Sequence, residues 1–121
     1  MIRAIRGAIT VEDDTPAAIL SATRELLLRL AAENELSEAE LVSILFTATP
    51  DLVSCFPARA ARDIGWTDTP LMCAVEMDVV DALPRCIRVL CHVETDRDRD
   101  AIQHVYLRKA KGLRPDWNPK G

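Results

Sequence analysis

The sequence has few of the residues, and lacks several of the motifs, on which common active sites depend. It contains two histidines, and aromatic residues make up only 4% of the chain. It has no G-x-S-x-G nucleophile motif, no P-loop and no G-x-G-x-x-G dinucleotide-binding motif. One histidine, His92, falls in a predicted strand, where a structural or edge-exposed role is commoner than catalysis. The sequence therefore predicts either a protein that is not an enzyme or an enzyme whose reaction needs no proton relay.

Long hydrophobic runs and a basic surplus are also missing. No apolar stretch approaches the ~18 residues that a membrane-spanning helix needs. The segment 1–14 lacks the apolar core of a signal peptide. The net charge of -4 does not suit a nucleic-acid-binding surface, which usually needs clustered positive charge. These absences predict a cytoplasmic protein with neither a membrane nor a nucleic acid as its partner.

The four cysteines form no C-x-x-C pair, so free thiols packed as small hydrophobic groups are expected. Cys86 and Cys91 lie on one predicted strand, an odd number of positions apart. Because side chains alternate along a strand, the two thiols should face opposite sides. A zinc site built on this pair is therefore not expected, and no metal or other cofactor is predicted.

A chain of 121 residues predicts one domain over residues 1–121. A domain of this size buries roughly two-thirds of the surface of its unfolded chain, which leaves little room for a deep private pocket. Size alone therefore favours an oligomer in which a neighbouring subunit completes a ligand site.

Apolar periodicity and capping residues divide most of the chain into strands and helices. Thr15 is a predicted helix N-cap and Pro16 suits the first helical position, while Gly65 suits a helix end. The predicted strands are 1–10, 41–47, 70–77 and 85–93, and the predicted helices are 15–34 and 58–64, with a helical turn at 37–40. The segment from residue 101 is predicted to be a tail, flexible from about residue 115. This order predicts an α/β or α+β domain with a mixed β-sheet.

Three charged residues, Arg6, Glu76 and Arg88, interrupt otherwise apolar predicted strands. One such charge usually faces solvent or protects a sheet edge, but three in three strands suggest that they gather. A buried charge must be paired or hydrogen-bonded. With Tyr106 nearby, these residues could form a structural network or a cleft for a small dianion that also carries a hydroxyl. Most of the 15 basic residues are arginines, which fits either carboxylate recognition or the codon usage of a GC-rich genome.

Several separated segments occur in an order that is characteristic of one enzyme family. The segments are IRAIRGAITVEDDT, ATPDL, FPARAAR, the strand with Cys73 and Glu76, CIRV around Arg88, HVYLRKA and LRPD. From Ile2 to about Asp116, the sequence resembles the small trimeric chorismate mutases of Bacillus-type bacteria. The resemblance implies a mixed β-sheet with helices packed on it. It also implies a homotrimer, shaped as a pseudo-α/β-barrel, with active sites at the subunit interfaces.

The resemblance further implies a cofactor-free Claisen rearrangement of chorismate to prephenate, in phenylalanine and tyrosine biosynthesis. Arg88 would stabilise charge on the breaking ether oxygen, and Glu76 would hold the ring hydroxyl of the substrate. Arg6 and Tyr106 would bind a carboxylate, and Cys73 would line the pocket on the same subunit.

Four more residues would complete the site, by the same resemblance. Phe56, Arg59 and Arg62 would reach it from the neighbouring subunit, and Arg114 would lie near its entrance. Arg59 stands where the family often has lysine, which keeps the charge. A pericyclic reaction needs no acid, base or nucleophile, only orientation and charge complementarity to the transition state, which agrees with the missing proton relay.

Two other functions fit part of the pattern. A non-catalytic trimer that binds an aromatic-pathway metabolite would need the arginines, but it could dispense with Glu76 or Arg88. A lyase that acts on a related enolpyruvyl compound would have a similar composition, although the resemblance along the whole chain disfavours it.

Overall fold

The computed structural model describes residues 1–113. The strands are β1 (Ile2–Thr10), β2 (Leu41–Ala48), β3 (Leu71–Val75), β4 (Cys86–Glu94) and β5 (Val105–Leu107). The α-helices are α1 (Pro16–Asn34) and α2 (Ala58–Asp63), and short 3-10 helices span Glu38–Glu40, Arg99–Ala101 and Arg108–Gly112. No helix within residues 1–113 is both long and apolar enough to cross a membrane.

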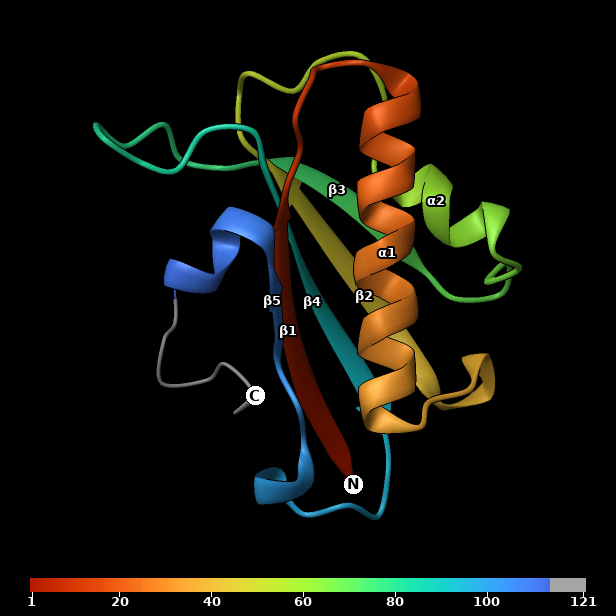
Figure 1. The fold of residues 1–121 in the computed structure, drawn as a ribbon. Coiled ribbons are helices and arrows are strands. Elements are labelled where there is room, and N and C mark those ends of the chain that lie inside the picture. The colour runs from red at the N-terminus through yellow and green to blue at the C-terminus, as the bar shows by residue number, and fades with distance from the viewer. Residues whose placement is uncertain (114–121) are drawn as a thin grey trace.

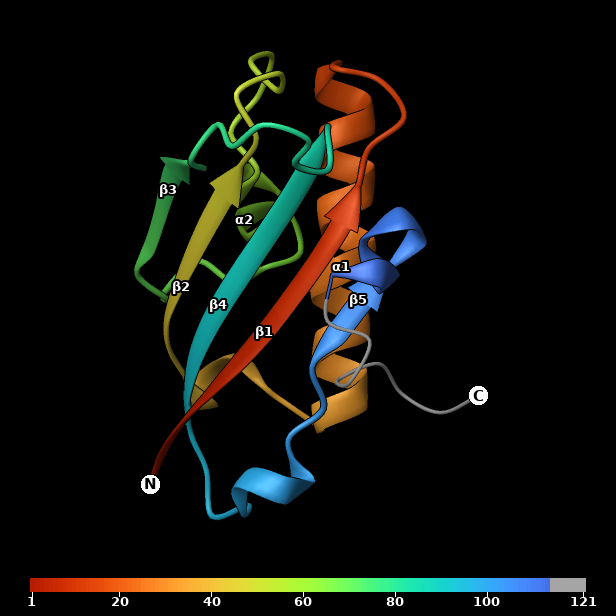
Figure 2. The same ribbon diagram turned by 90° about the vertical axis from the view of Figure 1, so that its left-hand side faces the viewer.

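The strands form one mixed sheet in the order β3-β2-β4-β1-β5. The central strand β4 runs antiparallel to both β1 and β2, while the outer strands β3 and β5 run parallel to their neighbours. Both α-helices lie on one face of the sheet (Figure 1). Figure 2 looks onto the other face, which neither α-helix covers. The predicted α+β fold with a mixed sheet is confirmed, and this asymmetry leaves one face available for a site.

Helix α1 begins and ends as its sequence predicts. The hydroxyl of Thr15 accepts a hydrogen bond from the amide of Ala18 at 3.1 Å, and Pro16 occupies the first turn. At the other end Glu35 adopts a left-handed conformation, with φ of 52°, and its amide donates to carbonyls of the last turn. The side chains at helical spacing are buried, and they are Ile19, Ala22, Leu26, Leu27 and Leu30.

Alternation along the strands separates the core from the uncovered face. On β4, Ile87, Val89, Cys91 and Val93 are buried in the main core, beneath α1. Cys86 is also buried, but on the opposite face, in a small cluster with Ala8, Tyr106 and Ala110. The prediction that Cys86 and Cys91 face opposite sides is therefore confirmed.

Gly7 allows the close approach of α1 to the sheet. A Cβ atom at this position would lie 3.1 Å from Cδ1 of Leu26 and 3.1 Å from the carbonyl oxygen of Val105. Both contacts are tighter than packed atoms normally tolerate, so a larger residue would push α1 or β5 away.

Most predicted boundaries agree with the structure to within one residue, and two predictions differ by more. The segment predicted to be a tail contains β5 and the 3-10 helix that follows it, and all of β5 is buried. A three-residue strand is too short to show periodicity, and its partner β1 is far away in the chain. The third strand also ends at Val75, one residue before Glu76. Arg114 and the predicted flexible end lie outside the described residues.

Candidate active site

The three charged residues that interrupt the strands do gather, at the uncovered face. Side chains alternate along each strand, which puts Arg6 of β1 and Arg88 of β4 on this face. Glu76 comes directly after β3, at a position whose side chain points to the same face. Together they line an open cleft of about 630 Å³, with the apolar side chains of Leu45 and Leu90 among its walls. The sheet therefore brings charged residues from three separate segments of the chain together at one cleft.

Glu76 is held by two partners. Its Oε1 lies 3.1 Å from Nε of Arg88, and its Oε2 accepts a hydrogen bond of 2.8 Å from the hydroxyl of Thr47. The backbone amide of Glu76 also donates to the carbonyl of Ala48, which extends the pairing of β3 with β2. The side chains of Arg88 and Glu76 are 31% and 14% exposed, so both line the cleft while remaining largely desolvated.

Tyr106 lies beside these residues on the same face. Ala8 pairs with Arg88 on one side and with Tyr106 on the other, so a small residue separates these two side chains. Given the spacing of strands, the Cα atoms of Arg88 and Tyr106 are roughly 10 Å apart. Tyr106 is only 2% exposed and belongs to the buried cluster with Ala8, Cys86 and Ala110, so it is not among the residues that line the cleft.

The cysteine beneath Arg88 is not a nucleophile at neutral pH. Burial raises the pKa of the Cys86 thiol to about 11, although the guanidinium of Arg88 acts in the opposite direction. Burial likewise raises the pKa of Cys91 to about 12. Both of these thiols are therefore protonated at neutral pH, so neither is suited to act as a nucleophile.

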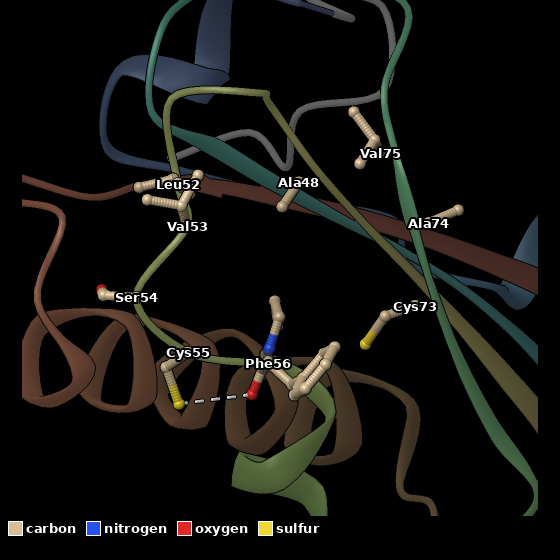
Figure 3. Close-up of a pocket in the computed structure, with 10 residues that line it drawn as sticks. Ala48, Leu52, Val53, Ser54, Cys55, Phe56, Cys73, Ala74 and Val75 are labelled. Carbon is tan, nitrogen blue, oxygen red and sulfur yellow. Dashed lines mark hydrogen bonds between the residues drawn. The ribbon is translucent and has the colours of Figure 1, made fainter.

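A second hollow, of about 460 Å³, lies on the other side of β3, and Phe56 and Cys73 both point into it (Figure 3). Phe56 is 73% exposed. Cys73 pairs with the core residue Phe46 and therefore faces the helix side of the sheet. We expected Cys73 to line the pocket of Arg88 on the same subunit, but the structure places it on the opposite face, because it lies three positions from Glu76 along one extended segment.

Arg59 and Arg62 lie on the helix that follows Phe56 in the chain, and they are not among the residues that line this hollow. Both are exposed on α2, whose remaining face is packed into the core through Ala60 and Ala61. Within one chain, the structure thus brings Arg6, Glu76, Arg88 and Tyr106 together on one face. Phe56 and Cys73 share the second hollow instead, while Arg59 and Arg62 lie exposed on α2, shortly after Phe56 in the chain.

A family model described as chorismate mutase type I matches residues 2–117. The chain belongs to the type I chorismate mutase family. The match covers nearly the whole chain, and it confirms the resemblance seen in the sequence and the predicted class of enzyme, an isomerase of chorismate.

Named relatives agree with the type I chorismate mutase assignment. The chain is 56% identical to chorismate mutase AroH of Thermus thermophilus over 117 residues, which cover 96% of each chain. It is 50% identical to chorismate mutase AroH of Bacillus subtilis (strain 168) over 117 residues, which cover 96% of this chain and 92% of the relative. A solved chorismate mutase from Clostridium thermocellum superposes with a TM-score of 0.89 at 52% identity, over 90% of this chain and 97% of that one.

The sequence did not single out two residues that support the site of this type I chorismate mutase. Thr47 binds Glu76, and His104 accepts a hydrogen bond from the backbone amide of Arg6 at 3.0 Å. The alternation of the second predicted strand would have placed Thr47 on the face of Arg88. No local pattern connects His104 with Arg6, because 98 positions separate them in the chain.

Proposed function

We propose that the chain converts chorismate to prephenate in the cleft lined by Arg6, Glu76 and Arg88. In this rearrangement an ether C–O bond breaks as a C–C bond forms, with no proton exchanged. The observation that carries the proposal is the Arg88–Glu76 pair at the wall of an open cleft, in a chain of the type I chorismate mutase family. Preorganised charge of this kind stabilises a polarised transition state without any acid or base.

The contacts within the cleft suggest a role for each residue. The guanidinium of Arg88 stabilises the negative charge that develops on the ether oxygen. Glu76, oriented by Thr47, accepts a hydrogen bond from the ring hydroxyl of the substrate. Arg6 and Tyr106 bind a carboxylate, for which the forked guanidinium of Arg6 is well suited. The same geometry disfavours a merely structural network, because an enclosed ion pair would not need to border a cleft.

We propose that the active enzyme is a homotrimer with sites shared between subunits. Phe56, Arg59 and Arg62 would complete the cleft of a neighbouring chain, and Cys73 would accompany them because it shares the hollow of Phe56. Large apolar side chains along and after β3 are exposed, and they are Met72 at 67%, Val75 at 75% and Met77 at 85%. A neighbouring subunit that covers them would remove this surface from water. Arg114, expected near the entrance, remains part of this proposal from the sequence resemblance alone.

The proposal also includes a cytoplasmic location and a step in phenylalanine and tyrosine biosynthesis. The direct test is to incubate purified protein with chorismate and identify the product by chromatography. Prephenate, formed at an unchanged rate after exhaustive chelation, is the expected result. Release of pyruvate would favour the lyase, and binding without turnover would favour the regulator.

A further inference from the structure

We propose that His104 is a positioning residue, which sets the location of Arg6 by accepting a hydrogen bond from its backbone. The amide nitrogen of Arg6 lies 3.0 Å from Nδ1 of His104. The inference rests on the proposed role of Arg6 in binding the substrate. His104 itself lies one residue before β5 and is not among the residues that line the cleft.

The ring of His104 supplies the hydrogen-bond acceptor that a neighbouring strand would normally supply. β5 pairs with β1 only from Gly7 onward, where Gly7 lies opposite Val105. Arg6 is therefore the first residue of β1, going toward the N-terminus, that has no β5 residue opposite it. Strands β4 and β5 flank β1 on opposite sides, and the amide of Arg6 points to the side of β5. The imidazole accepts the bond that the carbonyl of a longer β5 would have accepted, which keeps this amide satisfied.

The direction of this hydrogen bond determines which tautomer the His104 ring adopts. A backbone amide can only donate, so Nδ1 must carry no proton in this arrangement. The neutral ring then holds its proton on Nε2. An acceptor at Nδ1 is thus the feature that any substitute for His104 must reproduce.

The segment that carries His104 is itself anchored to the end of α1. The side-chain amide of Asn34, only 1% exposed, forms two hydrogen bonds with the backbone of Gln103. Its Oδ1 accepts from the amide of Gln103 at 2.7 Å, and its Nδ2 donates to the carbonyl of Gln103 at 2.8 Å. Nδ2 also donates to the carbonyl of Leu30 within α1, at 2.9 Å. The position of Arg6 is therefore linked through His104 and Asn34 to helix α1, whose apolar side chains are buried in the core.

A matched set of variants tests the proposal. In His104→Asn, the side-chain oxygen can occupy the place of Nδ1, whereas His104→Leu has a similar size and no acceptor. His104→Gln places its oxygen one atom further out, near the place of Nε2. We expect His104→Leu and His104→Gln to raise KM for chorismate about 5- to 10-fold, the effect typical of one lost hydrogen bond, with a smaller change in kcat. His104→Asn should restore KM to within about 2-fold of the original value.

A double-mutant cycle with Arg6→Ala separates positioning from general structural support. If His104 acts through Arg6, then His104→Leu should have no further effect on KM in the Arg6→Ala background. Additive effects of the two substitutions, or a KM that is unchanged in His104→Leu while Arg6→Ala is impaired, would overturn the inference. An Arg6→Ala enzyme with unchanged KM would instead show that the proposed role of Arg6 is wrong.

A spectroscopic measurement keeps the proposal testable if His104→Leu does not fold. Nitrogen-15 NMR of the ring in the original protein, assigned with His104→Asn, reports which nitrogen carries the proton. The expected signal at neutral pH is that of an unprotonated Nδ1 and a protonated Nε2. A proton on Nδ1 would exclude the hydrogen bond from Arg6 and with it the positioning role.

Discussion

The two faces of the β-sheet are built from the same strands, yet they have different contents. The face beneath α1 carries buried side chains that are almost all apolar, such as Ile5, Ile87 and Val89. The uncovered face carries Arg6 and Arg88 at the alternate positions, with Glu76 beside them. One face stabilises the fold and the other holds the proposed active site, so neighbouring residues on one strand should respond in opposite ways to substitution.

The largest effect should come from Arg88, on the uncovered face. Arg88→Ala should lower kcat on the order of 100- to 1000-fold, because a preorganised donor beside the developing oxyanion is lost. Arg88→Lys keeps the charge without the planar fork, so only partial recovery is expected. Turnover measured in steady state, with circular dichroism as the control for folding, provides the test.

The paired variant Arg88→Met, Glu76→Met distinguishes this role from neutralisation of Glu76. It removes both charges together, so the fold should survive, whereas the activity should not. Near-normal turnover in this double variant would mean that Arg88 serves structure alone.

Mixing inactive variants should show that the two separate halves of the site belong to different subunits. Arg62→Ala removes an exposed residue of α2, and Arg88→Ala removes one of the cleft. Random hybrid trimers would regain about a quarter of their sites, because one interface in four joins two intact halves. Activity should therefore rise well above that of either variant after co-refolding. A fully active monomer in light scattering would contradict the shared site.

Ile87, next to Arg88 on β4, should show the reverse behaviour. It is completely buried in the core, so Ile87→Ala should lower the free energy of unfolding by about 2–5 kcal/mol. Urea denaturation measures this loss. The kcat of the molecules that remain folded should change little, and a loss of kcat as large as that in Arg88→Ala would mean that the two faces are not independent.

Thr47 offers a smaller test of the uncovered face. Thr47→Val removes the hydroxyl that orients Glu76 and keeps the shape of the side chain, so kcat/KM should fall about 5- to 10-fold, the effect of losing one hydrogen bond worth about 1 kcal/mol. Thr47→Ser retains the hydroxyl and is the matched control. Equal values for the two variants would show that Thr47 does not orient Glu76.

The smallest effect should come from Asp14, which holds the loop before Phe56. Its Oδ1 accepts hydrogen bonds from the hydroxyl of Ser54 and from the amides of Val53 and Ser54. The pKa of Asp14 is lowered from its ordinary value of 3.8, chiefly by the hydrogen bond from the Ser54 hydroxyl.

A lowered pKa in the folded state fixes the sign of this effect. The contribution of Asp14 to stability is fully present above its unfolded pKa of 3.8, and it is lost as pH falls through the lower folded value. The difference in melting temperature between the original protein and Asp14→Asn should therefore be small near neutral pH and should shrink below about pH 4. A difference that grows on acidification would contradict this assignment. Because Asp14 is only partly buried, salt should reduce the difference as well.

The confirmed predictions came from the alternation of side chains along a strand and from the order of the sequence motifs. The alternation of β4 predicted the opposite faces of Cys86 and Cys91, and a cap with helical spacing predicted α1. The gathering of Arg6, Glu76 and Arg88 followed from charges in apolar strands, although their spacing left a structural network as open as a cleft. The position of Cys73 could have been predicted by the same parity, since it lies an odd number of positions from Glu76.

The sequence by itself determined which positions of β4 face the core and which face the cleft, because side-chain direction is a local property of an extended backbone. It also determined the limits of α1, where Thr15, Pro16 and the apolar spacing act within a few residues of one another. Only the tertiary structure decided the strand β5 and the contacts of Thr47 and His104. These depend on pairs 29 and 98 positions apart in the chain, and hydrogen bonds over such separations exist only once the sheet has brought the strands together.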